Sequence, residues 1–324
     1  MPHLARRLLL AAATASLAGP GHAQPAAAWP TRPVRVINPY SPGGTTDVVM
    51  RLMSERLERA FGQPFPVESR PGAGGSVGTA QAAAATDGHT LLITNTGPLA
   101  VAPALSPPPA YDPARSFAYV IMFGGAPIVV AVRADSPLRS IADFIAAARA
   151  RPEAVSYGNS GAGSMGHLAG LAFERATGAR LLHVPFRGAP EAQAAVLSGD
   201  TTAILDTVGA HAGSIRQGAL RALAFTSEGR VPLFPDVPTL AESGLPDTVV
   251  SNWFLLAAPQ SLPPEIGARI NAVCQRAMQE PTVAERLASL GLVSMGNPSP
   301  AEIAAFVARE GARWAPIVRA AGIG

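Results

Sequence analysis

The sequence contains no lysine, only one cysteine and few aromatic residues, and these shortages exclude some classes of protein. All 25 basic residues are arginine, they are scattered along the chain, and aromatic residues make up 6% of it. A nucleic-acid-binding surface needs clustered positive charge, usually with aromatic side chains on which bases stack. We therefore expect no nucleic-acid partner.

The shortage of thiols also bears on metal binding. The single cysteine, Cys274, cannot form a disulfide within the chain, and it lies at an apolar position of a helical pattern. The histidines at 89, 167, 183 and 211 do not show the short, regular spacing of a metal site. We therefore expect neither a metal nor another cofactor.

The first 23 residues have the features of an export signal. Arg6 and Arg7 precede an apolar stretch over 8–18, and small residues allow cleavage after Ala23. The apolar stretch is too short to span a bilayer, and no cysteine follows the cleavage site to carry a lipid. We expect a mature chain in the periplasm, without membrane insertion, exported by the general secretory or the twin-arginine route.

Alternating apolar runs and helical patterns predict an α/β protein. Strands are expected at 34–37, 64–68, 90–94, 119–123, 128–132, 155–158, 181–185, 201–205, 220–225 and 253–257, and helices at 47–61, 77–85, 141–150, 168–177, 189–197, 264–279 and 300–319. Short loops rich in glycine and proline connect them, which is typical of βαβ units and a mostly parallel sheet. The residues at 124–127, Gly-Gly-Ala-Pro, predict a turn between two of these strands.

A chain of 324 residues with 48% hydrophobic residues has room for two domains. The strand at 220–225 would return the chain to the first βα unit. The simplest packing therefore inserts one module within the other. We therefore expect residues 24–121 and 225–324 to form lobe 1 and residues 122–224 to form lobe 2.

The segment 39–47 joins the first strand to the first helix. It reads Pro-Tyr-Ser-Pro-Gly-Gly-Thr-Thr-Asp, so the strand must end and a helix must begin close to Asp47. A helix N-terminus has free backbone N–H groups and a positive partial charge, and glycines let an anion approach it closely. The segment is therefore a candidate anion-binding loop. The alternative interpretation is a simple βα turn in which Asp47 is only a cap.

A second loop, 159–164, repeats this arrangement with the residues Asn-Ser-Gly-Ala-Gly-Ser. In open α/β sheets the ligand lies beyond the carboxyl ends of the strands, so the two helix starts would face each other and hold the two ends of a dianion. The alternative is two unrelated βα turns. The candidate ligand-binding residues are Tyr40, Ser41, Gly43, Gly44, Thr45, Thr46, Asp47, Thr94, Asn95, Thr96, Asn159, Ser160, Gly161, Ala162, Gly163, Ser164, His167, Asp206 and Thr207.

Enzymatic chemistry has less support in the sequence than binding. The residues at 161–166 fit the G-x-G-x-x-G dinucleotide pattern, but the next strand ends without the acidic residue that would bind a ribose. Neither Ser160 nor Ser164 lies in a G-x-S-x-G turn. We therefore expect a binding protein without catalytic residues, and a periplasmic α/β enzyme is the less favoured alternative.

A series of short motifs carries a family resemblance. They lie in order at 39–47, 68–75, 87–92, 183–188, 220–224 and 235–239. Together they resemble the Bug-type substrate-binding proteins, the periplasmic receptors of tripartite tricarboxylate transporters. The resemblance covers about residues 30–322, which is nearly all of the mature chain.

This resemblance implies a type II periplasmic binding fold, with two α/β lobes, a hinge and a cleft that closes on a small carboxylate. It places the family's ligand loops at 41–47 and 159–164 and its acidic pocket position at Asp206. Thr207 follows that acid where the family usually has Asn, and Tyr40 and Ser41 replace the usual Phe-Pro or Phe-Ala. The implied partner is a membrane permease, served by a monomeric receptor. A sensory module for a signalling partner is the alternative, and the identity of the carboxylate stays open.

Overall fold

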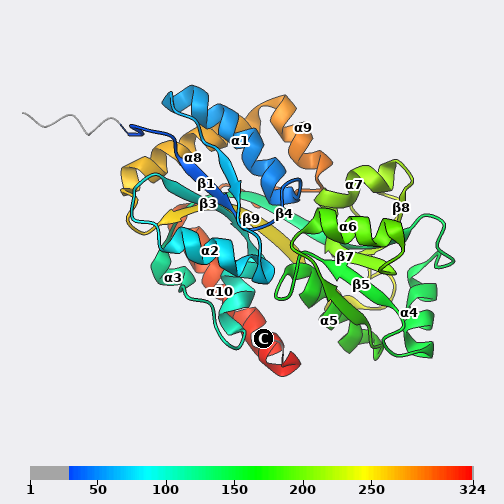
Figure 1. Cartoon of the computed structure of the whole chain (residues 1–324). Coiled ribbons are helices and arrows are strands. Elements are labelled where there is room, and N and C mark those ends of the chain that lie inside the picture. Colours follow the sequence, from blue (N-terminus) through cyan, green and yellow to red (C-terminus); the bar gives the residue numbers. More distant parts are fainter. Residues whose placement is uncertain (1–28, 323–324) are drawn as a thin grey trace, which may run out of the picture.

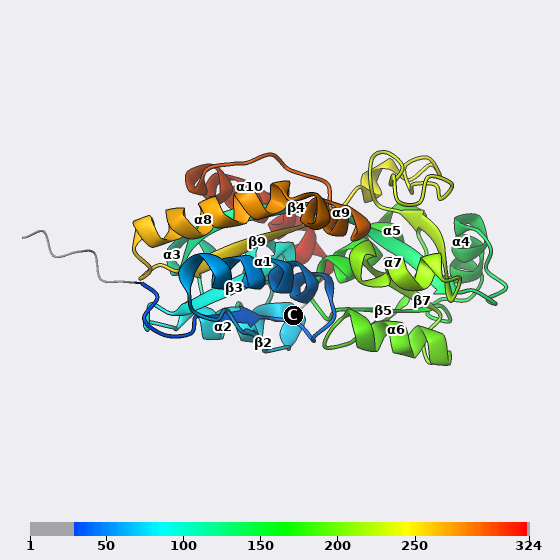
Figure 2. The same cartoon turned by 90° about the horizontal axis from the view of Figure 1, so that it is seen from above.

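The computed structural model describes residues 29–322, so the expected export signal and its cleavage site lie outside the described residues. Strands form a single sheet, and helices cover both of its faces (Figures 1 and 2). The strands are β1 (Arg35–Asn38), β2 (Val67–Ser69), β3 (Thr90–Asn95), β4 (Phe117–Arg133), β5 (Ser156–Asn159), β6 (Leu182–Pro185), β7 (Ala203–Thr207), β8 (Leu220–Phe225) and β9 (Ser251–Pro259). The α-helices are α1 (Thr45–Phe61), α2 (Ser76–Ala83), α3 (Pro113–Ser116), α4 (Ile141–Ala150), α5 (Met165–Thr177), α6 (Ala189–Ser198), α7 (Val208–Arg216), α8 (Pro264–Gln279), α9 (Pro281–Ser289) and α10 (Pro300–Ala321).

Strand β4 joins the two halves of this sheet. The strand order is β2-β1-β3-β9-β4-β7-β5-β6, with β8 also paired to β4. Residues 117–127 of β4 pair with β9, whereas residues 128–133 pair with β7 and β8. The first half of the sheet therefore contains β1, β2, β3 and β9, and the second half contains β5 to β8. Figure 1 shows these halves side by side, with β4 and β9 near the middle.

The turn predicted at 124–127 is wrong, because β4 continues through these residues. A register shift between Met122 and Gly124 absorbs the irregularity, and the pairing with β9 extends to Pro127. Gly125 also exchanges two backbone hydrogen bonds with Val293, of 3.0 and 2.8 Å. Gly-Gly-Ala-Pro favours a turn when it is considered by its local sequence alone. Here it forms part of a strand, because neighbouring segments provide hydrogen-bond partners for its backbone N–H and C=O groups.

The expectation of a mostly parallel sheet is also wrong. The pairs β1–β2, β1–β3, β5–β6 and β5–β7 are parallel, but every pair that includes β4 or β9 is antiparallel. The βα units follow the local rule that βαβ connections give parallel pairs. The two long strands run in the opposite direction, and no local pattern encodes their direction.

Three helices, the four-residue α3 and the longer α7 and α9, were not expected. Helix α7 contains glycines at 209 and 213, which weaken the helical pattern. Helix α9 begins at Pro281, directly after α8 ends, so a proline that usually ends a helix here occupies the first position of the next one.

The core lies on both faces of the sheet, as the central strand shows. Ile128, Val130 and Val132 of β4 belong to one buried cluster, while Val129 and Ala131 belong to the other. The first cluster includes side chains of α2, α4, α5 and α10, and the second includes side chains of α1, α7, α8 and α9. A strand covered by helices on both faces needs apolar residues at every position, which explains the uninterrupted run.

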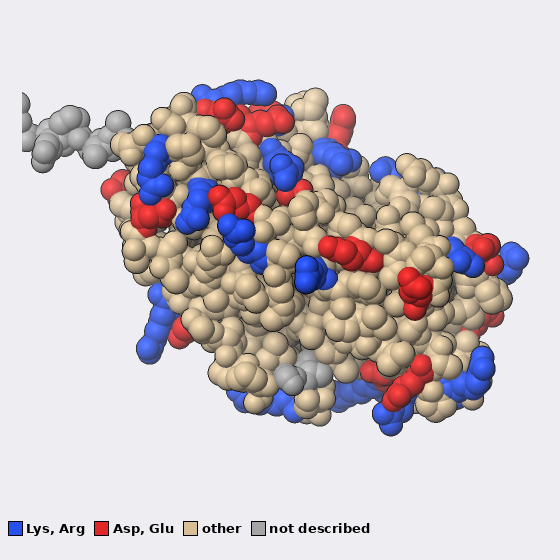
Figure 3. Space-filling model, viewed as in Figure 1, with Lys and Arg blue, Asp and Glu red and all other residues tan. Residues whose placement is uncertain are grey.

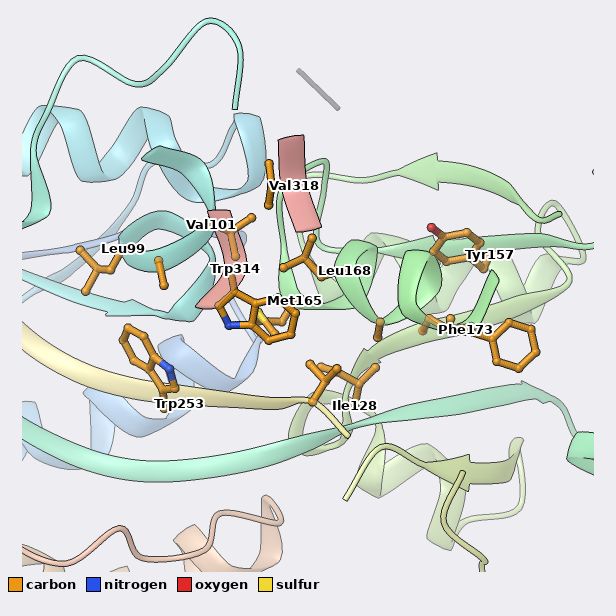
Figure 4. Close-up of a cluster of buried hydrophobic side chains, with 14 of the residues drawn as sticks. Leu99, Val101, Ile128, Tyr157, Met165, Leu168, Phe173, Trp253, Trp314 and Val318 are labelled. Atoms are coloured by element: carbon orange, nitrogen blue, oxygen red, sulfur yellow. The ribbon is translucent and has the colours of Figure 1, made fainter. Parts of the chain in front are cut away.

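The first cluster extends across both halves of the sheet. In Figure 4, Met165 and Leu168 of α5 lie beside Trp314 and Val318 of α10, and all four side chains are buried. Helix α10 covers the first half, and α5 covers the second. Their packing therefore connects the halves through apolar contacts.

Helix α5 lies unusually close to the sheet because it carries glycines on its inner face. A Cβ atom at Gly166 would stand 2.1 Å from the backbone oxygen of Leu205 in β7, and one at Gly170 would stand 2.3 Å from the hydroxyl of Tyr157 in β5. These contacts leave no room for a methyl group. They therefore determine where the N-terminus of α5 projects at the edge of the sheet.

Replacing one of these glycines tests the close packing. Gly166→Ala should reduce the free energy of unfolding by about 1–3 kcal/mol, since overpacking forces the helix away from β7. Gly213→Ala is the matched control, because it adds the same methyl group to helix α7 with nothing within 4 Å. It should be neutral or stabilising by up to about 1 kcal/mol. Urea unfolding measures both, and equal effects would contradict the packing argument.

Candidate ligand-binding site

A cavity lies between the two halves of the sheet. Strand ends and helix starts from both halves line it. Helix α1 contributes Thr45 and Thr46, α5 contributes Met165, α6 contributes Ala189, and α7 contributes Ala210 after Thr207 at its N-cap. Helix N-termini from both halves therefore converge on one space.

The N-termini of α1, α6 and α7 have no side-chain cap. Their N-cap residues are Gly44 and Gly188, which have no side chain, and Thr207, whose side chain accepts no hydrogen bond from the helix. The first-turn N–H groups of a helix have no partner inside it, so they remain available to a ligand. Among the described residues that line the cavity, none is Arg, Lys or His. An anion in this space would be held by backbone N–H groups and hydroxyls.

Asp206 is the acidic side chain of the cavity, and it is 4% exposed. The hydroxyl of Ser160 donates to its Oδ2 atom over 2.6 Å, and the backbone N–H of Thr207 donates to its Oδ1 atom over 2.7 Å. Burial raises the pKa of Asp206 to about 6, and these hydrogen bonds oppose the rise. The group is therefore mostly ionised at neutral pH, and it is an acceptor within a site that otherwise favours anions.

On the opposite wall, hydrogen bonds hold the side chains of the first loop. The hydroxyl of Tyr40 lies 2.9 Å from Oδ1 of Asn95 and 3.0 Å from the backbone oxygen of Gly74. Thr46 donates its hydroxyl to Asn38 over 2.8 Å. The hydroxyl of Thr45 is buried without a partner. The Thr45 hydroxyl is therefore a donor on this wall that is free for a ligand.

A pair of histidines supports the loop 159–164 from behind. Oδ1 of Asn159 accepts the N–H of Gly161 over 2.9 Å and lies 3.1 Å from Nε2 of His183. The N–H of Gly163 donates to Nδ1 of His167 over 3.2 Å, and the two imidazole rings stack with centroids 3.9 Å apart. His167 does not line the cavity, so its position supports a structural role for it.

The structure brings about half of the predicted site residues to the cavity. Those that line it are Tyr40, Gly44, Thr45, Thr46, Asn95, Ser160, Ser164, Asp206 and Thr207. Those that lie outside the lining are Ser41, Gly43, Asp47, Thr94, Thr96, Asn159, Gly161, Ala162, Gly163 and His167. Several members of the second group hold the loops in place. Asp47 accepts the N–H of Gly43 over 3.0 Å, and Thr96 accepts the N–H of Trp253 over the same distance.

Sequence reasoning missed five lining residues. They are Met165, Ala189, Ala210, Asn252 and Phe254. Ala189 had a local signal, since Gly188 and Pro190 mark a helix start just after a strand. No local sequence signal marks Asn252 and Phe254. They line the cavity because β9 pairs with strands that are distant in sequence.

The two halves touch each other around the cavity. Ser41 donates its hydroxyl to Glu191 of α6 over 2.6 Å. Gly74 lies so close to the second loop that a Cβ atom there would stand 2.1 Å from the backbone oxygen of Ala162. The described structure is therefore a closed form.

Three further observations concern the described residues. No helix within residues 29–322 has the length and apolarity needed to cross a membrane. In the same part of the chain, no group of His, Cys, Asp and Glu side chains is placed to hold a metal ion. Arginines and acidic residues are interspersed on the face seen in Figure 3.

The buried histidines predict that acid destabilises the ligand-free protein. Burial lowers the pKa of His167 and His211 to about 4 and that of His183 to about 3. Each histidine takes up a proton more readily in the unfolded chain, near pH 6.5, so its contribution to stability is present above that pH and is lost as the pH falls towards 4. The raised pKa values of Asp206 and Glu174 act in the opposite direction, but the histidines outnumber them.

The melting temperature should therefore be lower at pH 5 than at pH 7.5. His211→Gln removes one of the three titrating groups and should reduce this difference. Differential scanning calorimetry across the pH range measures both effects. A melting temperature that rises on acidification would contradict the argument.

Comparison with known proteins agrees with this geometry. Residues 49–323 match the family model described as "Tripartite tricarboxylate transporter family receptor". Protein BugT of Bordetella pertussis is 38% identical over 312 residues, which cover 96% of this chain and 94% of that protein.

Two solved structures of carboxylate-bound proteins are also similar to this chain. MatC from Rhodopseudomonas palustris, solved with bound malate, superposes with a TM-score of 0.84 at 32% identity, covering 90% of this chain and 100% of MatC. A second R. palustris protein, solved with adipate, has a TM-score of 0.86 at 32% identity, covering 91% of this chain and 99% of that protein.

The expected fold is thus confirmed as the type II periplasmic binding fold, with two βα lobes, a hinge and a ligand cleft between them. The function expected from the sequence, that of a carboxylate-binding receptor, is confirmed at the level of the family. The chain belongs to the tripartite tricarboxylate transporter receptors, the Bug-type periplasmic substrate-binding proteins.

Proposed function

We propose that this chain is exported to the periplasm, binds one small carboxylate between its lobes as a monomer, and delivers it to the permease of a tripartite tricarboxylate transporter without chemical conversion. The observation that carries this proposal is the convergence of helix N-termini on a buried cavity whose described lining has no cationic side chain. The malate and adipate held by the two related structures support the carboxylate class.

The energetics of such a site are sufficient. A hydrogen bond to a charged group contributes about 1.5–3 kcal/mol, and a helix terminus adds about 0.3–1 kcal/mol. Micromolar binding requires about 8 kcal/mol. A few N–H donors and the free hydroxyl of Thr45 would therefore hold a carboxylate, even after the cost of ordering the two lobes.

We place the lobes at 24–121 with 225–324, and at 122–224. This division assigns β1, β2, β3 and β9 to lobe 1 and β5 to β8 to lobe 2. Strand β4 passes from one lobe to the other. Its pairing partners change after residue 127, which supports a hinge a few residues beyond the boundary at 121. In this arrangement the cavity-lining residues from both loops contact the ligand, and the residues behind them, such as Asn159 and His167, position the loops.

The receptor proposal predicts metal-free binding at a single site. The purified chain without its first 23 residues should bind one equivalent of a small dicarboxylate in isothermal titration calorimetry. Ligand at 100 times its Kd stabilises the folded state by about 2.7 kcal/mol, so a thermal-shift panel of carboxylates finds the compound first. NMR after long incubation should show the compound unchanged. A reaction product would refute the non-enzymatic role, and a panel without any bound carboxylate would refute the ligand class.

Closure of the lobes is tested by a pair of glycine variants. Gly74 and Gly88 have nearly the same positive φ, 59° and 63°, so alanine causes similar local strain at both. Only Gly74 faces the other lobe, since nothing lies within 4 Å of a Cβ atom at Gly88. Gly74→Ala should weaken binding at least tenfold and prevent the ligand-induced decrease in radius of gyration seen by small-angle scattering. Gly88→Ala should show the normal affinity and compaction, and equal behaviour of the two variants would contradict the closed form described here.

A further inference from the structure

Asn252 lines the cavity, but the binding of a carboxylate does not explain its position. It lies on β9 and is 4% exposed. Its Nδ2 atom donates to the hydroxyl of Thr207 over 2.9 Å, which leaves its Oδ1 atom buried without a partner. A buried acceptor without a donor is unfavourable, and a ligand carboxylate has no proton to offer it.

A second acceptor lies in the same cavity. Each oxygen of Asp206 accepts one hydrogen bond, from Ser160 or from Thr207, and a carboxylate oxygen has capacity for another. Thr207 is the shared neighbour, because it binds Asn252 through its hydroxyl and Asp206 through its N–H. The two acceptors therefore belong to one hydrogen-bonded unit that connects β9 in one half of the sheet with β7 in the other.

We propose that Asn252 and Asp206 form a subsite for a hydrogen-bond donor, so that the ligand carries an ammonium or hydroxyl group on the carbon next to its carboxylate. This inference rests on the proposed receptor function and narrows its ligand class. The carboxylate binds to the helix N-termini, and the neighbouring donor lies between the Oδ1 atom of Asn252 and the carboxylate of Asp206.

The charge of the site distinguishes the two kinds of donor. The described lining holds one acidic side chain and no cationic one. An ammonium group has protons for both acceptors and neutralises Asp206, whereas a hydroxyl group has a proton for only one of them. The expected order of affinity is therefore an amino dicarboxylate first, its hydroxy analogue second and the donor-free compound last.

Titration calorimetry at pH 7.5 with two matched series tests this order. The first series is L-aspartate, L-malate and succinate, and the second is L-glutamate, L-2-hydroxyglutarate and glutarate. In the series that fits the cavity, the Kd of the donor-free compound should exceed that of the amino compound at least tenfold. If the donor-free compound binds as tightly as the others, the receptor function stands and this inference is wrong. If neither series binds but another carboxylate of the thermal-shift panel does, the receptor function stands and this inference is wrong.

Variants at position 252 test whether Asn252 causes the preference for a ligand with a hydrogen-bond donor. Asn252→Leu keeps a similar volume and removes the acceptor, so the Kd ratio between donor-free and amino compounds should fall at least fivefold. Asn252→Asp keeps an acceptor and adds a negative charge, so the ratio should be retained or increase. Thr207→Val is the matched control for the structural bond: it breaks the link to Asn252 and should change the affinities of all compounds by a similar factor. An unchanged ratio in Asn252→Leu, or a Thr207→Val variant that loses the ratio equally, would show that Asn252 only joins the two halves and would overturn the inference.

Discussion

The site depends on one physical property of the backbone, the unpaired N–H groups of the first turn of a helix. Each βα unit of this fold ends a strand at the edge of the sheet and begins a helix there, so α1, α5, α6 and α7 direct their N-termini into one cavity. Such groups carry a positive partial charge, cannot be deprotonated in the pH range of the periplasm and need no flexible side chain. This explains why a family of anion receptors can bind its ligands in a cavity without arginine or lysine in the lining described here.

The long strands β4 and β9 connect the two halves of the sheet on either side of this cavity. Both cross the middle of the sheet, and β4 exchanges its pairing partners between the two halves. The proposed hinge therefore lies in the same strand that contributes to both buried clusters. The closed form brings glycines into contacts that any side chain would prevent, as at Gly74 against Ala162. Small residues in the loops therefore serve the contact between lobes as well as the approach of an anion.

Few charged side chains lie in or near the cavity. Asp206 is buried among helix N-termini, and its ionised form is held by two hydrogen bonds rather than by a cation. Behind the second loop, His167 and His183 are neutral because burial lowers the pKa of both, and one of them accepts a hydrogen bond from that loop. Neutral imidazoles keep the loop in place without adding a fixed charge near the ligand.

The sequence by itself determined the βα units and the two glycine-rich loops, because strand ends, helix starts and glycine turns are encoded within a few neighbouring residues. Local patterns also identified Asp206 and the motifs of the family. Only the tertiary structure decided that β4 runs through Gly124 and Gly125 as a strand, that β4 and β9 are antiparallel to their neighbours, and that α6 and α7 also reach the cavity. Asn252 belongs to this second group. Asn252 lies beside Thr207 because segments distant in sequence pair with each other. The spacing of residues along the chain does not predict which strands pair.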